Sequence, residues 1–198
     1  MLMHSYWEKF HPMPYGGIKR KVFVSYSHLD DSIVEGFVNS WAYRENVFIP
    51  KVVGVRDTDN FINSDDTEYV MSKIRDNYVG DSSVTIVLIG ACTHSRRYVD
   101  WEIKASLRQA ADGLPNGLLA ILLSGLNAAV LPERLRANWN AQDRSCYARY
   151  RPVPSTAEQL AGWIEDAYQA RTTRAQWIDN PREMMRHNRV CEVHGVTH

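Results

Sequence analysis

The sequence predicts an α/β fold in which helices cover a doubly wound parallel sheet of about five strands. Short apolar runs that suit buried strands alternate along the chain with stretches whose apolar residues recur every three or four positions, as on one face of a helix. The run 84–89 is apolar almost throughout, which is typical of the buried middle of a parallel sheet. With 198 residues, the chain is long enough to bury one substantial core.

Strands and helices are expected in strict alternation over most of the chain. The expected strands are 21–26, 47–55, 84–89, 118–124 and 146–150, of which the second is loosened at its start by Pro50. Four helices are inferred from apolar residues about one turn apart: Ile33, Phe37 and Trp41; Val70, Ile74 and Tyr78; Val99, Ile103 and Leu107; and Leu160, Ile164 and Tyr168. Residues 131–140 predict a short helix or an irregular insertion.

Polar and turn-forming residues indicate where these helices begin and end. Asp30 or Asp31 can cap the first helix, and Gly80 suits the C-terminal end of the second. Ser155 and Glu158 have the spacing of a capping box in front of the last helix.

We expect one domain over residues 18–170, with an extension at each end. Residues 1–17, rich in aromatic residues, His and Pro, predict an N-terminal arm that packs on the body or on a partner. The last helix forms a C-terminal helical extension, and residues 171–198 predict a polar tail with a solvated surface.

Composition argues against several classes of protein. The 23 Lys and Arg residues balance 23 Asp and Glu residues, so no net charge recruits nucleic acid or a membrane surface. The run 118–123 is too short to span a bilayer, and residues 1–17 lack the apolar block of a secretory signal. Three scattered cysteines form no CxxC pair and predict no disulfide framework. We therefore expect a soluble protein of the reducing cytoplasm.

The most informative feature is a carboxylate near the end of a predicted central strand. The strand 84–89 runs into Gly90 and a short polar loop, and a helix then carries Glu102 one turn from its start. In α/β proteins, ligands bind in the crevice beyond the carboxyl ends of the strands. Glu102 is therefore the leading candidate for chemistry, although it could instead be a solvated acid near Arg96, Arg97 or Lys104.

Other polar residues are expected at the same edge of the sheet. Ser25 and Tyr26 end the first strand, His28 lies on the loop after it, and His94 lies on the loop after the strand 84–89. The histidines show no HExxH or paired spacing, and the acids of the loop 56–66 lack the pattern of a calcium loop, so no metal site is expected. Neither GxGxxG nor GxxxxGK(S/T) occurs, which argues against redox use of NAD and against nucleoside triphosphate hydrolysis.

Two segments of the chain resemble a TIR domain. Phe23-Val24-Ser25-Tyr26, followed by two acids, resembles the opening strand of that family. Ser95 to Glu102 is similar to the family's S-x-x-W-C-x-x-E segment, with Tyr98 at the Trp position, Val99 at the Cys position and Glu102 at the catalytic glutamate. Residues 85–90 and 96–103 resemble most closely the TIR-like subunit of Thoeris anti-phage systems. The resemblance implies a flavodoxin-like sheet.

The resemblance also implies that NAD⁺ is a substrate and that no cofactor is needed. Enzymatic TIR domains break the bond between nicotinamide and ribose, and Thoeris members rejoin the ADP-ribose into a cyclic or otherwise modified messenger that activates a separate effector protein. It is compatible with a homo-oligomer and with a phage-derived trigger as partners. Neither nucleic acid nor a membrane is implied.

The candidate residues have distinct roles in this chemistry. A fixed carboxylate at Glu102 would stabilise the positive charge that develops on the ribose. Tyr98 would wall the pocket or stack on a ring, while Ser25, Tyr26 and His28 would contact the substrate. The loop 57–66, which resembles the mobile loop of TIR domains, would close over the site with Phe61-Ile62 as an apolar lid, and its Asp57 is a further candidate for substrate binding.

Three alternatives compete with a messenger synthase. The chain could be a TIR module that assembles without chemistry, or an enzyme that only hydrolyses NAD⁺ to ADP-ribose. A receiver-like signalling domain shares the topology but needs an Asp at the end of the third strand and a Lys at the end of the fifth. This sequence has neither, so we reject that alternative.

Overall fold

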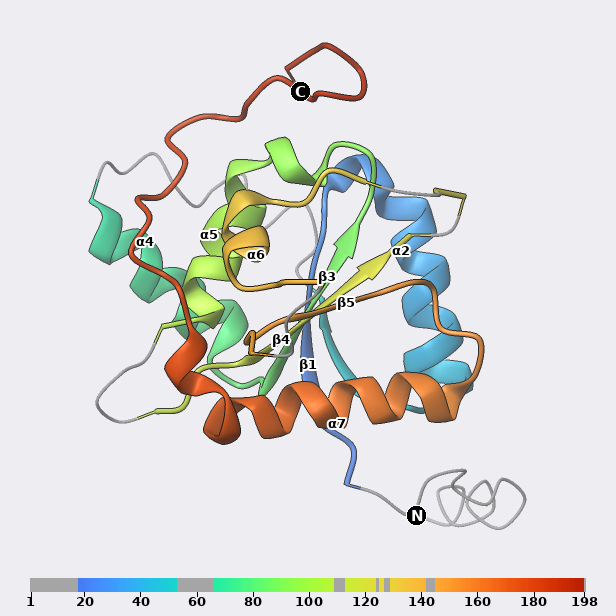
Figure 1. Ribbon diagram of the computed structural model, residues 1–198. Coiled ribbons are helices and arrows are strands. Elements are labelled where there is room, and N and C mark those ends of the chain that lie inside the picture. Colours follow the sequence, from blue (N-terminus) through green and yellow to red (C-terminus); the bar gives the residue numbers. More distant parts are fainter. Residues whose placement is uncertain are drawn as a thin grey trace, which may run out of the picture.

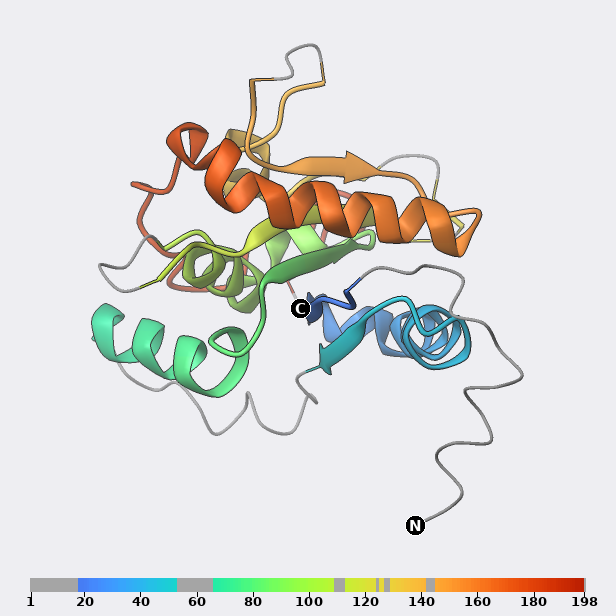
Figure 2. The same cartoon turned by 90° about the horizontal axis from the view of Figure 1, so that it is seen from below.

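The fold is an α/β sandwich built on one five-stranded parallel sheet. The computed structural model describes residues 18–52, 66–108, 113–123, 125–126, 129–141 and 145–197. All strand pairs are parallel, and the strand order is β2-β1-β3-β4-β5, with helices on both faces (Figures 1 and 2). The predicted doubly wound fold is confirmed.

The elements follow the expected alternation. The strands are β1 (Lys21–Ser25), β2 (Ile49–Val52), β3 (Val84–Ile89), β4 (Gly117–Leu122) and β5 (Arg149–Arg151). The α-helices are α2 (Asp31–Val38), α4 (Thr67–Ile74), α5 (Arg97–Ser106), α6 (Glu133–Ala137) and α7 (Ala157–Thr173). Two π-helical segments, η2 (Asn39–Arg44) and η3 (Arg75–Val79), extend α2 and α4, while the short 3₁₀ segments are η1 (His28–Asp30), η4 (Thr93–Ser95) and η5 (Ala175–Trp177).

The two faces of the sheet bury different sets of helices. Helices α2 and α7 pack with η2 on the face that carries Val22 and Val24 of β1. Helices α4, α5 and α6 cover the opposite face, where Phe23 lies. Because side chains alternate along a strand, Ser25 at the end of β1 lies on the same face as Phe23. The sequence of β1 therefore directs Ser25 toward α5.

Most predicted boundaries hold, with shifts that have simple causes. Ile33 is 41% exposed instead of buried, because α2 turns Val34 toward the sheet. The expected strand 146–150 begins only at Arg149, since Cys146 and Tyr147 are buried outside the ladder.

The capping prediction for the last helix is off by one residue. Thr156, not Ser155, is the N-cap of α7, and its hydroxyl accepts a hydrogen bond from the Gln159 amide. The short helix expected within residues 131–140 is present as α6. Residues 1–17 and 53–65, which include the predicted arm and the end of the second expected strand, lie outside the described residues.

The C-terminal tail does not leave the domain after α7 but returns along α5 (Figure 1). Lys104 donates to the carbonyl of Arg182, Trp101 to that of Met185, and Arg189 to that of Ser95. Arginine side chains of the tail at 182, 186 and 189 are exposed, as expected for a polar surface. The backbone of this segment is nevertheless hydrogen-bonded to α5 and to η4 in front of it.

A disulfide joins the end of this tail to the loop after β3. Cys92 and Cys191 are paired across 99 residues, and the third cysteine, Cys146, is buried and takes no part in this bond. The expectation that the cysteines form no framework is therefore wrong. Sequence spacing could not reveal the pair, because only the return of the tail brings Cys191 to Cys92. None of the helices in the described ranges is both long enough and apolar enough to cross a membrane.

A buried ion pair fixes α5, α6 and the tail to one another. The Arg134 guanidinium donates to both oxygens of Asp100, at 3.0 and 3.4 Å, and Arg134 is only 1% exposed. It also donates to the side chain of Asn180 and the carbonyl of Glu183. The pair therefore holds the tail against both helices.

Replacing Arg134 by Met should lower the free energy of unfolding by about 3–5 kcal/mol, because Asp100 would be left as a buried charge without its partner. Arg136→Met, an exposed position on the same helix, serves as the control and should change stability by less than about 0.5 kcal/mol. Urea denaturation measures both. Equal stability of the two variants would contradict this role.

Candidate functional site

The site forms where the end of β1 meets α5. The Ser25 hydroxyl donates a hydrogen bond of 2.6 Å to Oε2 of Glu102. Ser25 is 1% exposed, whereas Glu102 is partly accessible. Strand and helix thus bring together two of the residues that the sequence predicts at this edge.

Helix α5 is held rigidly against the sheet, which fixes the position of Glu102. Val99, Ile103 and Leu107 are buried on the sheet, as their spacing predicts. On the next turn, the Ser106 hydroxyl donates to the carbonyl of Glu102 and lies 2.7 Å from the Thr85 hydroxyl of β3. The backbone of Glu102 is therefore linked to the central strand.

The carboxyl group of Glu102 is strongly perturbed. Although part of the residue is reachable by solvent, protein atoms surround the carboxyl group, and this burial raises its pKa from the ordinary value of 4.5 to about 8. The hydrogen bond from Ser25 acts in the opposite direction and lowers the pKa by a smaller amount. A carboxyl with a pKa near neutrality is a common mark of a functional site.

Tyr26 belongs to the same group of side chains. Burial raises its pKa to about 12, and the nearby carboxylates of Asp31 and Glu102 add to the shift. The phenol therefore stays protonated at neutral pH, and its hydroxyl donates a hydrogen bond to the Asp31 carboxylate.

His28 and Arg96 face each other across two loops at this edge. An Nη2 atom of Arg96 lies 2.7 Å from Nδ1 of His28. Because a guanidinium can only donate, a ring nitrogen of His28 is the acceptor in this contact. Arg96 is 6% exposed, and its Nη1 has no hydrogen-bond partner among the described residues. A buried cation with an unused donor is suited to an anionic group of a ligand.

Arg96 is a candidate for ligand binding that the sequence alone indicates only as a possible neighbour of Glu102. The position of Arg96 in the polar loop after a buried strand was the available signal. What the sequence could not show is that its side chain contacts His28.

Tyr98 lies one turn before Glu102 on α5, within an aromatic cluster. Its ring packs edge-on against Trp101, with 5.4 Å between the ring centroids, and its hydroxyl accepts a hydrogen bond from Arg97. This packing fixes the ring of Tyr98 one turn away from Glu102.

Asp30 approaches the loop after β3 so closely that a side chain at residue 90 would displace its carboxylate. A Cβ on Gly90 would lie 2.1 Å from Oδ2 of Asp30. Asp30 occupies the N-cap position of α2 but makes no side-chain cap, in contrast to the prediction for this residue. Oδ2 has no hydrogen-bond partner among the described residues, and burial raises the pKa of the carboxyl.

The remaining predicted residues fall outside this group. His94 is buried, and its Nε2 accepts a hydrogen bond from the backbone amide of Glu192, so it binds the tail. Asp57 and the proposed lid lie outside the described residues. A separate surface pocket of about 470 Å³ is lined by Arg134, Asp179 and Arg182 near α6, on a different part of the molecule.

A known protein family matches the segment that carries these residues. The family model for the TIR-like domain of Thoeris protein ThsB matches residues 23–128, just over half of the chain. The matched span includes Ser25, Arg96 and Glu102. No curated protein matches the chain.

The raised pKa of Glu102 predicts a pH dependence of stability. Because the folded state holds the proton up to a pH of about 8 and the unfolded state only up to about 4.5, wild type should lose stability relative to Glu102→Gln as the pH rises between these values. The difference should grow by at most about 1.4 kcal/mol per pH unit and level off above pH 8. Urea denaturation of both proteins across this range measures it, and a difference that does not vary with pH would refute the shift.

Proposed function

Because the chain belongs to the Thoeris ThsB TIR-like domain family, we propose that it breaks the nicotinamide–ribose bond of NAD⁺ and forms a cyclic or otherwise modified ADP-ribose messenger. The observation that carries this proposal is the Glu102 carboxyl, held by Ser25 at the carboxyl edge of the sheet. Ser25, Tyr26, His28, Asp57 and Tyr98 are the proposed substrate contacts.

One carboxylate is enough for the bond-breaking step. Nicotinamide is neutral once it leaves the cationic ring, so its departure needs no general acid. The ribose becomes positively charged in the transition state, as in glycoside hydrolysis. A carboxylate fixed beside it stabilises this charge, and does so strongly because its surroundings exclude water.

The substrate itself can ionise Glu102. With a pKa of about 8, the carboxyl is mostly protonated at neutral pH in the free protein. The positive nicotinamide ring favours the charged form and lowers this pKa when it binds. Binding of NAD⁺ is therefore coupled to release of a proton, and the carboxylate forms where the cation is.

Arg96 and His28 supply polar groups for the part of NAD⁺ that lies beyond the nicotinamide ring. The buried Nη1 of Arg96, which has no partner among the described residues, would bind an oxygen of the pyrophosphate after a rearrangement that exposes it. The hydroxyl of Tyr26, which donates to Asp31, can accept a hydrogen bond from a ribose hydroxyl. These contacts would orient the scissile bond toward the carboxylate.

The fate of ADP-ribose depends on what reaches the ribose after nicotinamide leaves. A messenger requires that water is excluded while another nucleophile attacks, and closure of the loop 57–66 is our candidate for this step. We place the reaction in the cytoplasm, where NAD⁺ is available. A phage-derived trigger, self-assembly and a separate effector that reads the messenger complete the proposal.

Glu102→Gln should reduce NAD⁺ turnover below detection while the fold is kept, since the change removes the charge and preserves the shape. Glu35→Gln, at an exposed position on α2, is the matched control and should act like wild type. Mass spectrometry of NAD⁺ incubated with each protein and with lysate of phage-infected cells gives the result. Wild-type turnover by Glu102→Gln would exclude this mechanism.

The same assay separates the possible products. A product with the mass of cyclic ADP-ribose, or of a conjugate, supports a messenger, whereas a product one water heavier indicates plain hydrolysis. Unchanged NAD⁺ under every condition would favour an assembly module without chemistry.

Ser25→Ala should slow turnover at neutral pH by about ten- to hundredfold, because a hydrogen bond to a charged group contributes about 1.5–3 kcal/mol. Loss of this bond also raises the pKa of Glu102, so the deficit should shrink above pH 8. A pH–rate profile measures both effects, with the exposed Ser32→Ala as control. A deficit that is the same at every pH would show that Ser25 does not act through Glu102.

A further inference from the structure

The end of the tail forms a tight turn with the spacing of a metal-binding motif. Cys191 and His194 are separated by two residues and followed by Gly195. The Gly195 amide donates to the carbonyl of Cys191 at 2.7 Å, and Gly195 has a φ of +69°, which favours glycine. The turn therefore brings the thiol of Cys191 and the imidazole of His194 to one side.

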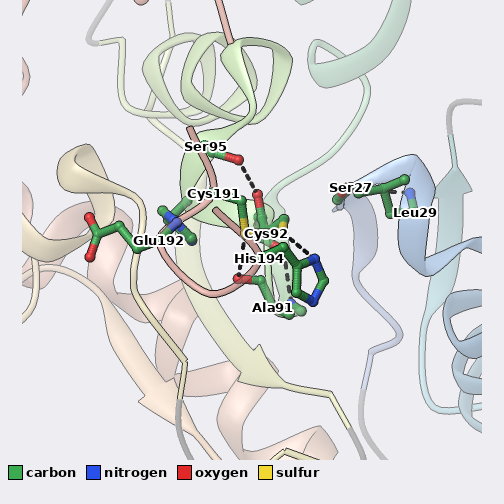
Figure 3. The surroundings of a disulfide bond; sticks show 11 residues. Ser27, Leu29, Ala91, Cys92, Ser95, Cys191, Glu192 and His194 are labelled. Atoms are coloured by element: carbon green, nitrogen blue, oxygen red, sulfur yellow. Dashed lines mark hydrogen bonds between the residues drawn. A yellow bond between two sulfur atoms is a disulfide. The ribbon is translucent and has the colours of Figure 1, made fainter. Parts of the chain in front are cut away.

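A third ligand comes from the loop after β3. The two sulfur atoms of Cys92 and Cys191 and Nδ1 of His194 all lie within 4.8 Å of one another, and the Cys92 sulfur is 3.2 Å from Nδ1 of His194 (Figure 3). Both cysteines are buried, whereas His194 is exposed. Two thiolates and an imidazole are ligands that Zn²⁺ prefers.

The disulfide is not the only link between the tail and this loop. The Glu192 amide donates to Nε2 of His94, and the Arg189 amide donates to the carbonyl of Ser95. On the loop itself, the Ser95 hydroxyl donates to the carbonyl of Cys92. These bonds flank both cysteines, so they keep the thiols near each other after the disulfide is reduced.

We propose that the reduced chain binds one Zn²⁺ ion through Cys92, Cys191 and His194, with water as the fourth ligand on the exposed side. Disulfides are rare in the cytoplasm, where thiols of small molecules and proteins reduce them. A reductant of this class supplies two electrons and two protons, its own sulfurs form a new disulfide, and both cysteines become thiols. Zinc then displaces the two protons from these thiols.

The site would pin the tail beside the proposed substrate edge in the reduced state. Asp30, whose carboxyl lies against Gly90, is close enough to His194 for the imidazole to influence its pKa. A zinc ion and the disulfide would hold the tail at the same place, and oxidation of the two cysteines would release the metal. The sequence search for HExxH and CxxC missed the site because its third ligand is 99 residues away from Cys191.

Metal analysis of the full chain tests this proposal. The protein is reduced with a phosphine, stripped of metal, dialysed against Zn²⁺ and then against buffer. Wild type should retain one zinc per chain and, with Co²⁺, should show thiolate-to-cobalt charge-transfer absorption. Protein oxidised before the zinc is added should retain none.

Variants assign the ligands. Cys191→Ser should lose the zinc, and His194→Ala, at an exposed position that does not threaten the fold, should weaken affinity at least about tenfold. Cys146→Ser and His187→Ala are the matched controls and should bind like wild type. Reduced wild type that retains no zinc, or His194→Ala that binds as tightly as wild type, would overturn the proposal. Because the readout is metal content, the result does not depend on NAD⁺ cleavage.

Discussion

The buried ion pair between Asp100 and Arg134 holds three separate parts of the chain together, and the candidate site depends on it because Asp100 lies on the same helix as Glu102. Arg134 ties α5 to α6 and to the tail at Asn180 and Glu183. The amide of Met185 donates to the second carboxylate oxygen of Asp100. Helix α5 is thus fixed from outside by the tail and from inside by the sheet, and its carboxylates have little freedom.

The two acids of this helix have opposite environments. Asp100 faces a guanidinium and an amide, which compensate a buried charge. The Glu102 carboxyl accepts a hydrogen bond from the neutral Ser25 hydroxyl, and burial raises its pKa to about 8. The Asp100 carboxylate stabilises the fold, whereas the Glu102 carboxyl still lacks a compensating positive charge. We propose that a cationic substrate supplies this positive charge, which favours both the binding of the substrate and catalysis.

Much of the fold could be predicted from the sequence, because it rests on local patterns. Continuous apolar strands and the spacing of Val99 and Ile103 are enough to predict a parallel sheet with α5 packed on it. The sequence does not determine which of two neighbouring apolar residues, such as Ile33 and Val34, is buried, because this depends on how the helix is oriented on the sheet.

The site was predictable only in part. Strand ends and a family resemblance predict Glu102 and Ser25, but not that the two residues are bonded to each other. The position of Arg96 against His28 and the pairing of Cys92 with Cys191 require the return of distant segments, for which no local pattern exists.

The most direct measurement is a crystal structure of Glu102→Gln with NAD⁺. Our account predicts the nicotinamide–ribose bond beside residue 102, with the pyrophosphate near Arg96. NAD⁺ bound elsewhere, or bound with its nicotinamide end away from residue 102, would contradict it.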